Sequence, residues 1–244
     1  MTDLLAAFGD RVLLAHAHPD DETISTGGTI AALLTRGADV LVVTGTRGER
    51  GEVVPGPLHE LEGTSALPAH RERELAAALS ALGGPGHAWL GEERRRRYVD
   101  SGMAWGPDGF AVAADDAPTE ALSLAALDEV VGDLSILATA FRPTSIVSYD
   151  VRGGYGHPDH VRMREAAGMV AEHLGLPLFE IVEPRVDDGP GEAALDLIAL
   201  GSLPAKRAAM AAHATQLTLD GDDFVLSGGQ RHPVARVERY RRAG

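Results

Sequence analysis

Residues 11–22 read RVLLAHAHPDDE and carry the strongest structural signal in this 244-residue chain. The first seven of them form an apolar run, which is typical of a strand that is buried on both faces. The polar segment 18–22 follows directly and contains a proline, which suits the first turn of a helix. We therefore predict a buried strand over 11–17 that ends in imidazole and carboxylate side chains where a helix begins.

The residues that follow extend this strand into a strand–helix–strand unit. Residues 24–36 place apolar side chains at helical spacing, and residues 38–44 form a second apolar run. Such a unit within about 35 residues predicts a right-handed parallel crossover. Further strands are expected over 87–90, 145–149 and 178–182, and further helices over 69–82, 118–140, 158–174 and 204–213. The alternation predicts a Rossmann-like, doubly wound α/β fold with a mostly parallel sheet.

Two long stretches, 45–68 and 91–117, are rich in glycine and charged residues and are predicted to be loops. Loops of this kind cluster outside the carboxyl ends of parallel strands, where active sites are built. We see no domain boundary and expect a single domain over residues 1–244. The stretch after residue 216 shows no clear pattern.

Composition excludes several functions. The net charge of −14 disfavours nucleic acid and anionic membrane surfaces as partners. The chain has no cysteine, so a metal would need histidine and carboxylate ligands. We find neither a targeting segment nor an apolar stretch of membrane-spanning length, and therefore expect a cytoplasmic protein. The oligomeric state cannot be read from the sequence.

A second polar segment, residues 157–160 (HPDH), repeats the features of the first. It follows the predicted strand 145–149 and the glycine-rich loop 153–156, and it also begins a helix. Parallel strands of one sheet would bring both segments to the same edge. Within each segment, side chains at positions i and i+3 can converge, as His18 with Asp21 and His157 with His160.

Three of these side chains, His18, Asp21 and His160, would supply two nitrogens and one oxygen. Three protein ligands and an open position are typical of catalytic zinc. Asp20 would lie beside the metal and accept a proton from water, and His157 would polarise or protonate the substrate. Either segment alone could be a helix cap with an acidic first turn, but two such segments at strand ends favour a metal site.

The chain resembles the PIG-L/LmbE family of zinc-dependent N-acetylglucosamine deacetylases, and more closely the actinobacterial branch that handles mycothiol precursors and conjugates. The resemblance spans residues 11–216. It rests on the stretches 17–22 and 153–160 and, less specifically, on 46–52, 71–75, 100–103 and 213–216. It implies zinc as the cofactor, with iron(II) as a second option, and a small amino sugar as the substrate.

The resemblance also implies roles for single residues. It gives the same three ligands as the spacing, with Asp20 as the general base and His157 as the acid or electrophilic group. It adds Asp159, which would orient His157, and Tyr155, a mobile hydroxyl that would bond to the tetrahedral intermediate.

Three further residues are open to two interpretations. Arg71 lies on the inward face of its helix and could pair with Glu74 or contact the substrate, as the family implies. Asp100 is either a turn residue or an acceptor for sugar hydroxyls. His213 is expected to be a structural residue at a helix end.

These residues together predict a metal-dependent hydrolase that converts the acetamide of an N-acetylglucosamine-type sugar, with inositol as one option for the aglycone, to an amine and acetate. The alternative within the family is an amidase that acts on mycothiol S-conjugates or another N-acyl substrate. A nucleotide-binding Rossmann protein would need a glycine-rich turn after its first strand, where this chain has residues 18–22 instead. A metal-binding or sugar-binding module without catalysis is disfavoured because the base position holds a carboxylate, Asp20.

Overall fold

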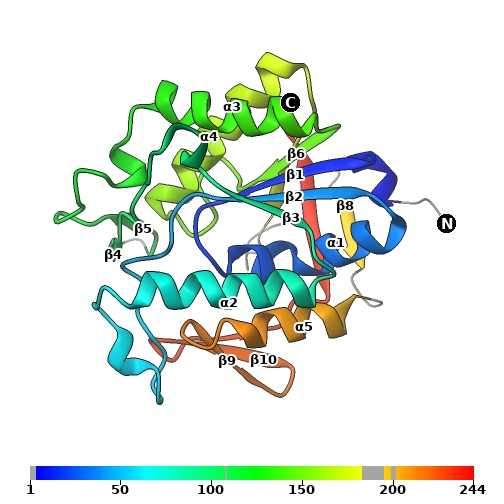
Figure 1. Ribbon diagram of the computed structural model, residues 1–244. Coiled ribbons are helices and arrows are strands. Elements are labelled where there is room, and N and C mark those ends of the chain that lie inside the picture. Colours follow the sequence, from blue (N-terminus) through cyan, green and yellow to red (C-terminus); the bar gives the residue numbers. More distant parts are fainter. Residues whose placement is uncertain (1–3, 108, 183–194, 199–201) are drawn as a thin grey trace.

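The computed structural model describes residues 4–107, 109–182, 195–198 and 202–244 (Figure 1). Its central sheet has the strand order β3-β2-β1-β6-β7-β12-β8. These strands are β1 (Arg11–His16), β2 (Asp39–Thr44), β3 (Gly86–Trp89), β6 (Ser145–Ser148), β7 (Leu178–Val182), β8 (Leu195–Ile198) and β12 (Val237–Arg242). Two smaller sheets consist of β4 (Met103–Trp105) with β5 (Ala111–Ala113), and of β9 (Leu217–Asp220), β10 (Asp223–Leu226) and β11 (Arg231–Pro233).

Helices cover both faces of the central sheet (Figure 1). The helices are α1 (Asp21–Arg36), α2 (Leu67–Ala81), α3 (Leu127–Phe141), α4 (Pro158–Leu174) and α5 (Leu203–Ala212). Side chains of β1 alternate between the two layers, as strand geometry requires. Leu13 packs in the core with α3 and α4, and Leu14 packs in the core with α1, α2 and α5. Among the described helices, none combines the length and the apolar character that a membrane crossing needs.

The order of the strands places a topological switch point between β1 and β6. From β1 the chain proceeds through β2 to β3 on one side, whereas β6 is followed by β7 on the other. All four of these pairings are parallel. The prediction of a doubly wound, mostly parallel sheet is confirmed, and the crevice at a switch point is where such sheets bind ligands.

Three parts of the chain differ from expectation. The expected helix 118–140 is wrong in its first part, because α3 begins only at Leu127. Residues 118–126 instead bond to the preceding loop, where the N–H of Leu122 donates to the carbonyl of Val99. The predicted loop 91–117 contains the β4–β5 hairpin. The stretch after residue 216 supplies β12, an antiparallel strand between β7 and β8.

A buried carboxylate fastens this last strand to the helical layer. Glu238 of β12 accepts hydrogen bonds from the backbone N–H groups of Gly28 (2.8 Å) and Thr29 (2.7 Å) in α1. It also pairs with the ammonium of Lys206 in α5 at 2.7 Å. Lys206 is fully buried and Glu238 is 4% exposed. Charged groups are tolerated in such a place only when their partners are all present.

We predict that Lys206→Met lowers the free energy of unfolding by about 3–5 kcal/mol, because it leaves the charge of Glu238 buried without its counter-ion. Urea unfolding followed by circular dichroism measures the change. Arg231→Ala is the control, since it removes exposed ion pairs with Asp220 and Asp223 and is expected to change stability little. Equal effects of the two substitutions would contradict the prediction.

Candidate metal centre and active site

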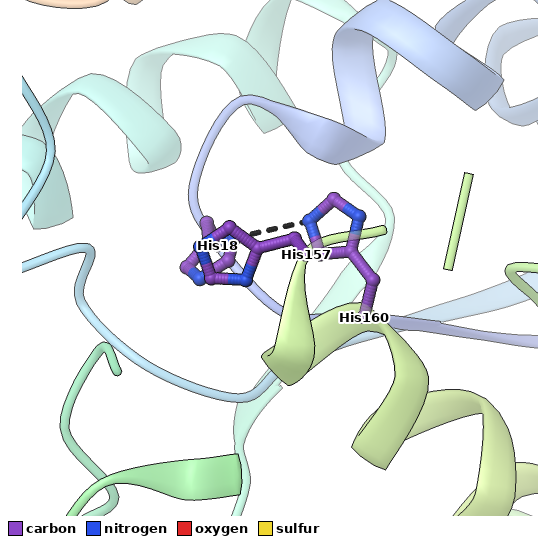
Figure 2. Close-up of side chains that lie close together, drawn as sticks. All are labelled: His18, His157 and His160. Carbon is purple, nitrogen blue, oxygen red and sulfur yellow. Dashed lines mark hydrogen bonds between the residues drawn. The ribbon is translucent and has the colours of Figure 1, made fainter. Parts of the chain in front are cut away.

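The switch point brings the two polar segments together. His18 follows β1, Asp21 is the first residue of α1, and the second segment begins α4. The histidines of both segments are buried, at 7% exposure for His18, 5% for His157 and 2% for His160. Figure 2 shows His18 and His160 with a ring nitrogen of each turned toward the other, and the ring centroids of His18 and His157 are 4.5 Å apart.

Three electron-pair donors form a small triangle at this point. His18 Nδ1 and His160 Nε2 are 3.2 Å apart, and Asp21 Oδ2 lies 3.4 Å from each of them. Ligand atoms at about 2.1 Å from a tetrahedral ion are separated from one another by about 3.4 Å. The triangle therefore has the size that a single divalent ion requires.

Outer contacts direct the lone pairs of both imidazoles into this triangle. His18 Nε2 lies 3.2 Å from Asp159 Oδ2, and His160 Nδ1 lies 3.2 Å from the carbonyl of Gly153. Each of these ring nitrogens faces an acceptor and so carries the proton, which leaves the other nitrogen of each ring as an electron-pair donor. Against the effect of burial, the carboxylates of Asp100, Asp159 and Asp21 raise the pKa of His18 well above its usual value, so without a metal a proton on His18 supplies positive charge here. A divalent ion would replace that proton, and the two nitrogens and the carboxylate oxygen would then suit it as ligands.

Tyr149 completes the support of this group, and sequence reasoning missed it. Its hydroxyl donates to Asp21 Oδ2 at 2.6 Å and accepts the N–H of Ala17 at 2.7 Å. Its ring stacks on that of His160 with centroids 4.0 Å apart and planes inclined by 9°. Burial and the nearby Asp21 raise the pKa of Tyr149, so the phenol keeps its proton. The only signal in the sequence is a tyrosine at the end of the predicted strand 145–149.

Asp20 directly precedes Asp21 of the triangle. It stands at the N-cap position of α1, but its side chain makes no capping hydrogen bond. Its carboxylate is instead 3.4 Å from the guanidinium of Arg71, and the side chain is 16% exposed. Burial raises the pKa of Asp20 to about 6, against the opposing effect of Arg71. The segment 18–22 thus begins the helix without a capping bond from the Asp20 side chain, and the carboxylate of Asp20 is available for chemistry.

His157 does act as a helix cap, because its Nδ1 accepts the N–H of Asp159 at 3.2 Å. The ring proton is therefore on Nε2, which lies 3.9 Å from Asp100 Oδ1. Burial lowers the pKa of His157 to about 3, and the neighbouring His18 adds to the effect. His157 thus presents a neutral N–H group to the site.

Asp159 does not have the expected orientation. Its carboxylate lies against His18 and accepts hydrogen bonds from the backbone N–H and the hydroxyl of Ser101. The hydrogen bond between Asp159 and His157 is made by the backbone N–H of Asp159. Because Ser101 holds the carboxylate, Asp159 orients His18 through its side chain and hydrogen-bonds to His157 through its backbone.

Asp100 combines the two interpretations that its sequence context left open. It accepts the N–H of Gly102 at 2.8 Å as a turn residue does, and its Oδ1 also lies 3.6 Å from His18 Nε2. Burial opposes ionisation, but His18 and the Gly102 amide hold the pKa of Asp100 below its usual range. Asp100 is thus an ionised acceptor beside the histidines.

Of the two interpretations of Arg71, the pairing with Glu74 is wrong. Arg71 is 2% exposed and donates to the carbonyls of Gly48 (2.9 Å) and Pro19 (2.5 Å) in addition to its contact with Asp20. A Cβ at Gly48, where φ is +65°, would lie 1.8 Å from the guanidinium, so the chain can pass this close only at a glycine. Arg71 therefore braces the loop of Asp20.

Tyr155 lies near the rings of His157 and His160 and is closer to the surface than they are. Its side chain is more open than the histidines, with an exposure of 36%. Its ring centroid is 5.2 Å from that of His160, 6.1 Å from that of His157 and 6.1 Å from that of Trp105 in β4. Tyr155 therefore lies between the buried centre and the β4–β5 hairpin.

A doubly wound sheet that gathers two imidazoles and a carboxylate at its switch point defines an α/β protein with a candidate hydrolytic metal centre. Residues 13–171 match the family model described as PIG-L, GlcNAc-PI de-N-acetylase, and the chain belongs to this family.

One curated relative and two solved structures illustrate the similarity. A 1D-myo-inositol 2-acetamido-2-deoxy-alpha-D-glucopyranoside deacetylase of Kineococcus radiotolerans is 38% identical over an alignment 277 positions long, which covers 95% of this chain and 76% of the relative. A deacetylase from the teicoplanin pathway, solved in complex with teicoplanin, has a TM-score of 0.65 and 21% identity, and the match covers 96% of this chain and 98% of that one. The N,N'-diacetylchitobiose deacetylase from Pyrococcus horikoshii has a TM-score of 0.59 and 22% identity, with coverages of 86% and 73%. At these identities the two solved structures show the shared fold.

We predict that Tyr149→Phe weakens the binding of a divalent ion by about 10–100-fold, because the outer partners of metal ligands have effects of this size. Zinc titration of chelator-treated protein by calorimetry measures it. Tyr98→Phe is the matched control, since it removes a buried hydroxyl that donates at 2.7 Å to Asp133, which is not one of the proposed ligands. If both substitutions leave the affinity unchanged, Tyr149 has no part in the metal centre.

Proposed function

We propose that this protein hydrolyses the acetamide of an N-acetylated amino sugar, of the N-acetylglucosamine type and linked to inositol, to a free amine and acetate. The observation that carries the proposal is the buried triangle of donor atoms with the carboxylate of Asp20 beside it and without a structural bond to its helix. The family and the printed name of the Kineococcus relative support the choice of substrate. The proposal needs no nucleic acid or membrane partner, and it places the reaction in the cytoplasm.

In this proposal His18, Asp21 and His160 hold the metal. Two imidazoles and a carboxylate suit zinc, and iron(II) binds such sites as well. When bound, a divalent ion would polarise the acetamide carbonyl and lower the pKa of a water molecule.

Asp20 accepts the proton of the attacking water. With a pKa raised to about 6 by burial, its carboxylate is mostly ionised at neutral pH and yet basic enough to take up a proton, which is the condition for an effective general base. Arg71 keeps the carboxylate in place through the contact at 3.4 Å. This arrangement favours a role of Arg71 through Asp20 over a direct contact with the substrate.

His157 and Tyr155 act on the other side of the amide. The neutral His157 donates its Nε2–H to the acetamide oxygen as negative charge develops there, because donors aimed at developing charge stabilise the transition state. Tyr155, which is more exposed, adds a hydroxyl to the same region. Asp100 accepts hydrogen bonds from the sugar hydroxyls.

A panel of amides tests the proposed function. Protein reconstituted with zinc or iron(II) is expected to release amine from inositol-linked N-acetylglucosamine faster than from free N-acetylglucosamine and N,N'-diacetylchitobiose, as followed by a fluorogenic amine reagent. Chelator-treated protein is the control. If only a mycothiol S-conjugate amide were hydrolysed, the amidase alternative would replace the deacetylase.

We predict that Asp20→Asn lowers kcat by about two to four orders of magnitude, since this is the range for loss of a general base. The amide keeps the shape of the side chain, so the ion is expected to remain bound. Elemental analysis and the amine-release assay on the same preparation measure both quantities. Normal turnover in Asp20→Asn would end the assignment of Asp20 as the base.

A further inference from the structure

The segment after α5 contacts the first turn of α1, beside Asp20 and Asp21. The sequence predicted only a structural histidine in this segment. His213 is fully buried, and its Nε2 lies 2.7 Å from Glu22 Oε1 in α1. Glu22 is fully buried as well. The two residues are 191 positions apart in the chain, and His213 lies outside the stretch 13–171 that the family model matches. A contact of this kind between two buried polar side chains needs an explanation.

The second oxygen of Glu22 leads to the proposed base. Glu22 Oε2 accepts the backbone N–H of Asp20 at 2.9 Å. Asp20 has a φ of +107°, which L residues rarely adopt and which persists only where the surroundings enforce it. The hydrogen bond from the Asp20 N–H to Glu22 holds the backbone in this conformation, and His213 in turn holds the carboxylate of Glu22.

We infer that Glu22 and His213 form a positioning pair for Asp20, fixing the backbone from which its carboxylate is aimed at the reacting water. The inference rests on the proposed function for the identity of the base. His213 does not touch the reacting atoms. It holds the carboxylate of Glu22, and Glu22 holds the strained peptide of Asp20, because each carboxylate oxygen of Glu22 has its own buried partner, His213 Nε2 at 2.7 Å and the Asp20 N–H at 2.9 Å.

The same segment contains a comparison pair that lacks this connection. Thr215, which is also fully buried, donates its backbone N–H and its hydroxyl to Glu74 in α2 at 2.8 and 2.6 Å. Its hydrogen bonds fasten the segment to a helix but do not include Asp20. If His213 had a merely structural role, its substitution would affect stability and kcat in the same way as a substitution of Thr215.

The geometry of His213 also defines a conservative variant. Its Nε2 makes the contact with Glu22, while in the described part of the chain its Nδ1 has no hydrogen-bond partner. A glutamine places its amide nitrogen near the position of Nε2 and can donate to Glu22 in the same way. His213→Gln should therefore preserve the pair that His213→Ala destroys.

The test measures kcat, KM, metal content and urea unfolding for four variants. We expect His213→Ala to lower kcat about 10–100-fold, the range for outer partners of catalytic groups, with KM and metal content unchanged. His213→Gln is expected to recover most of kcat. Thr215→Val is expected to lower stability and leave kcat at the wild-type value. Glu22→Gln can accept only one of the two N–H bonds and is also expected to lower kcat. This variant tests the inference if His213→Ala does not fold.

Three kinetic outcomes would overturn the inference: a wild-type kcat in both His213→Ala and Glu22→Gln, no recovery in His213→Gln, or an equal loss of kcat in Thr215→Val. A crystal structure of His213→Ala or Glu22→Gln gives a readout that does not depend on the substrate. We expect Asp20 to leave its φ near +107° in that structure, and an unchanged Asp20 would overturn the inference. If the wild-type protein hydrolyses none of the acetamido sugars, the proposed function fails. The crystal structures of the variants still show whether Glu22 and His213 hold the backbone of Asp20.

Discussion

The parallel pairing of β1 with β6 is the constraint on which the active site depends. Val12, Leu13 and Leu14 pair in register with residues 145–147. β1 leads directly into the first polar segment, and β6 leads into the second through the loop 149–156. Because parallel strands have their carboxyl ends at the same edge, side chains that are 142 positions apart, His18 and His160, come within 3.2 Å. The helices α1 and α4 then begin at this edge, and side chains of their first turns, Asp21 and His160, come within 3.4 Å.

The partners around the donor triangle differ in chemistry but have the same effect. A carboxylate from α4, a loop carbonyl and a tyrosine hydroxyl each saturate the outer side of one donor. Since imidazole has only two nitrogens, a hydrogen bond on one decides the lone pair on the other. The site is therefore preorganised for a cation by groups that would not themselves contact it, as is typical of metal centres in proteins.

The C-terminal part of the chain secures α1 at two points. Glu238 binds the N–H groups of Gly28 and Thr29 in the body of the helix, and His213 binds Glu22 in its first turn. These contacts are buried, so each charge or dipole requires its partner. The helix that presents Asp20 and Asp21 is thus held by residues from the part of the chain in which sequence patterns were weakest.

The sequence by itself determined the strand–helix alternation, the parallel class of the sheet and the two segments that meet at its edge, because buried runs and proline-marked helix starts are local signals. Only the tertiary structure decided that Arg71 binds Asp20 and not Glu74, that Asp159 faces His18, and that Tyr149 supports Asp21. It also decided that residues 237–242 enter the central sheet and that residues 118–126 are not part of α3. The physical reason is that a buried polar group bonds to whichever partner the packed fold brings within about 3 Å, and distance along the chain does not indicate which partner that is.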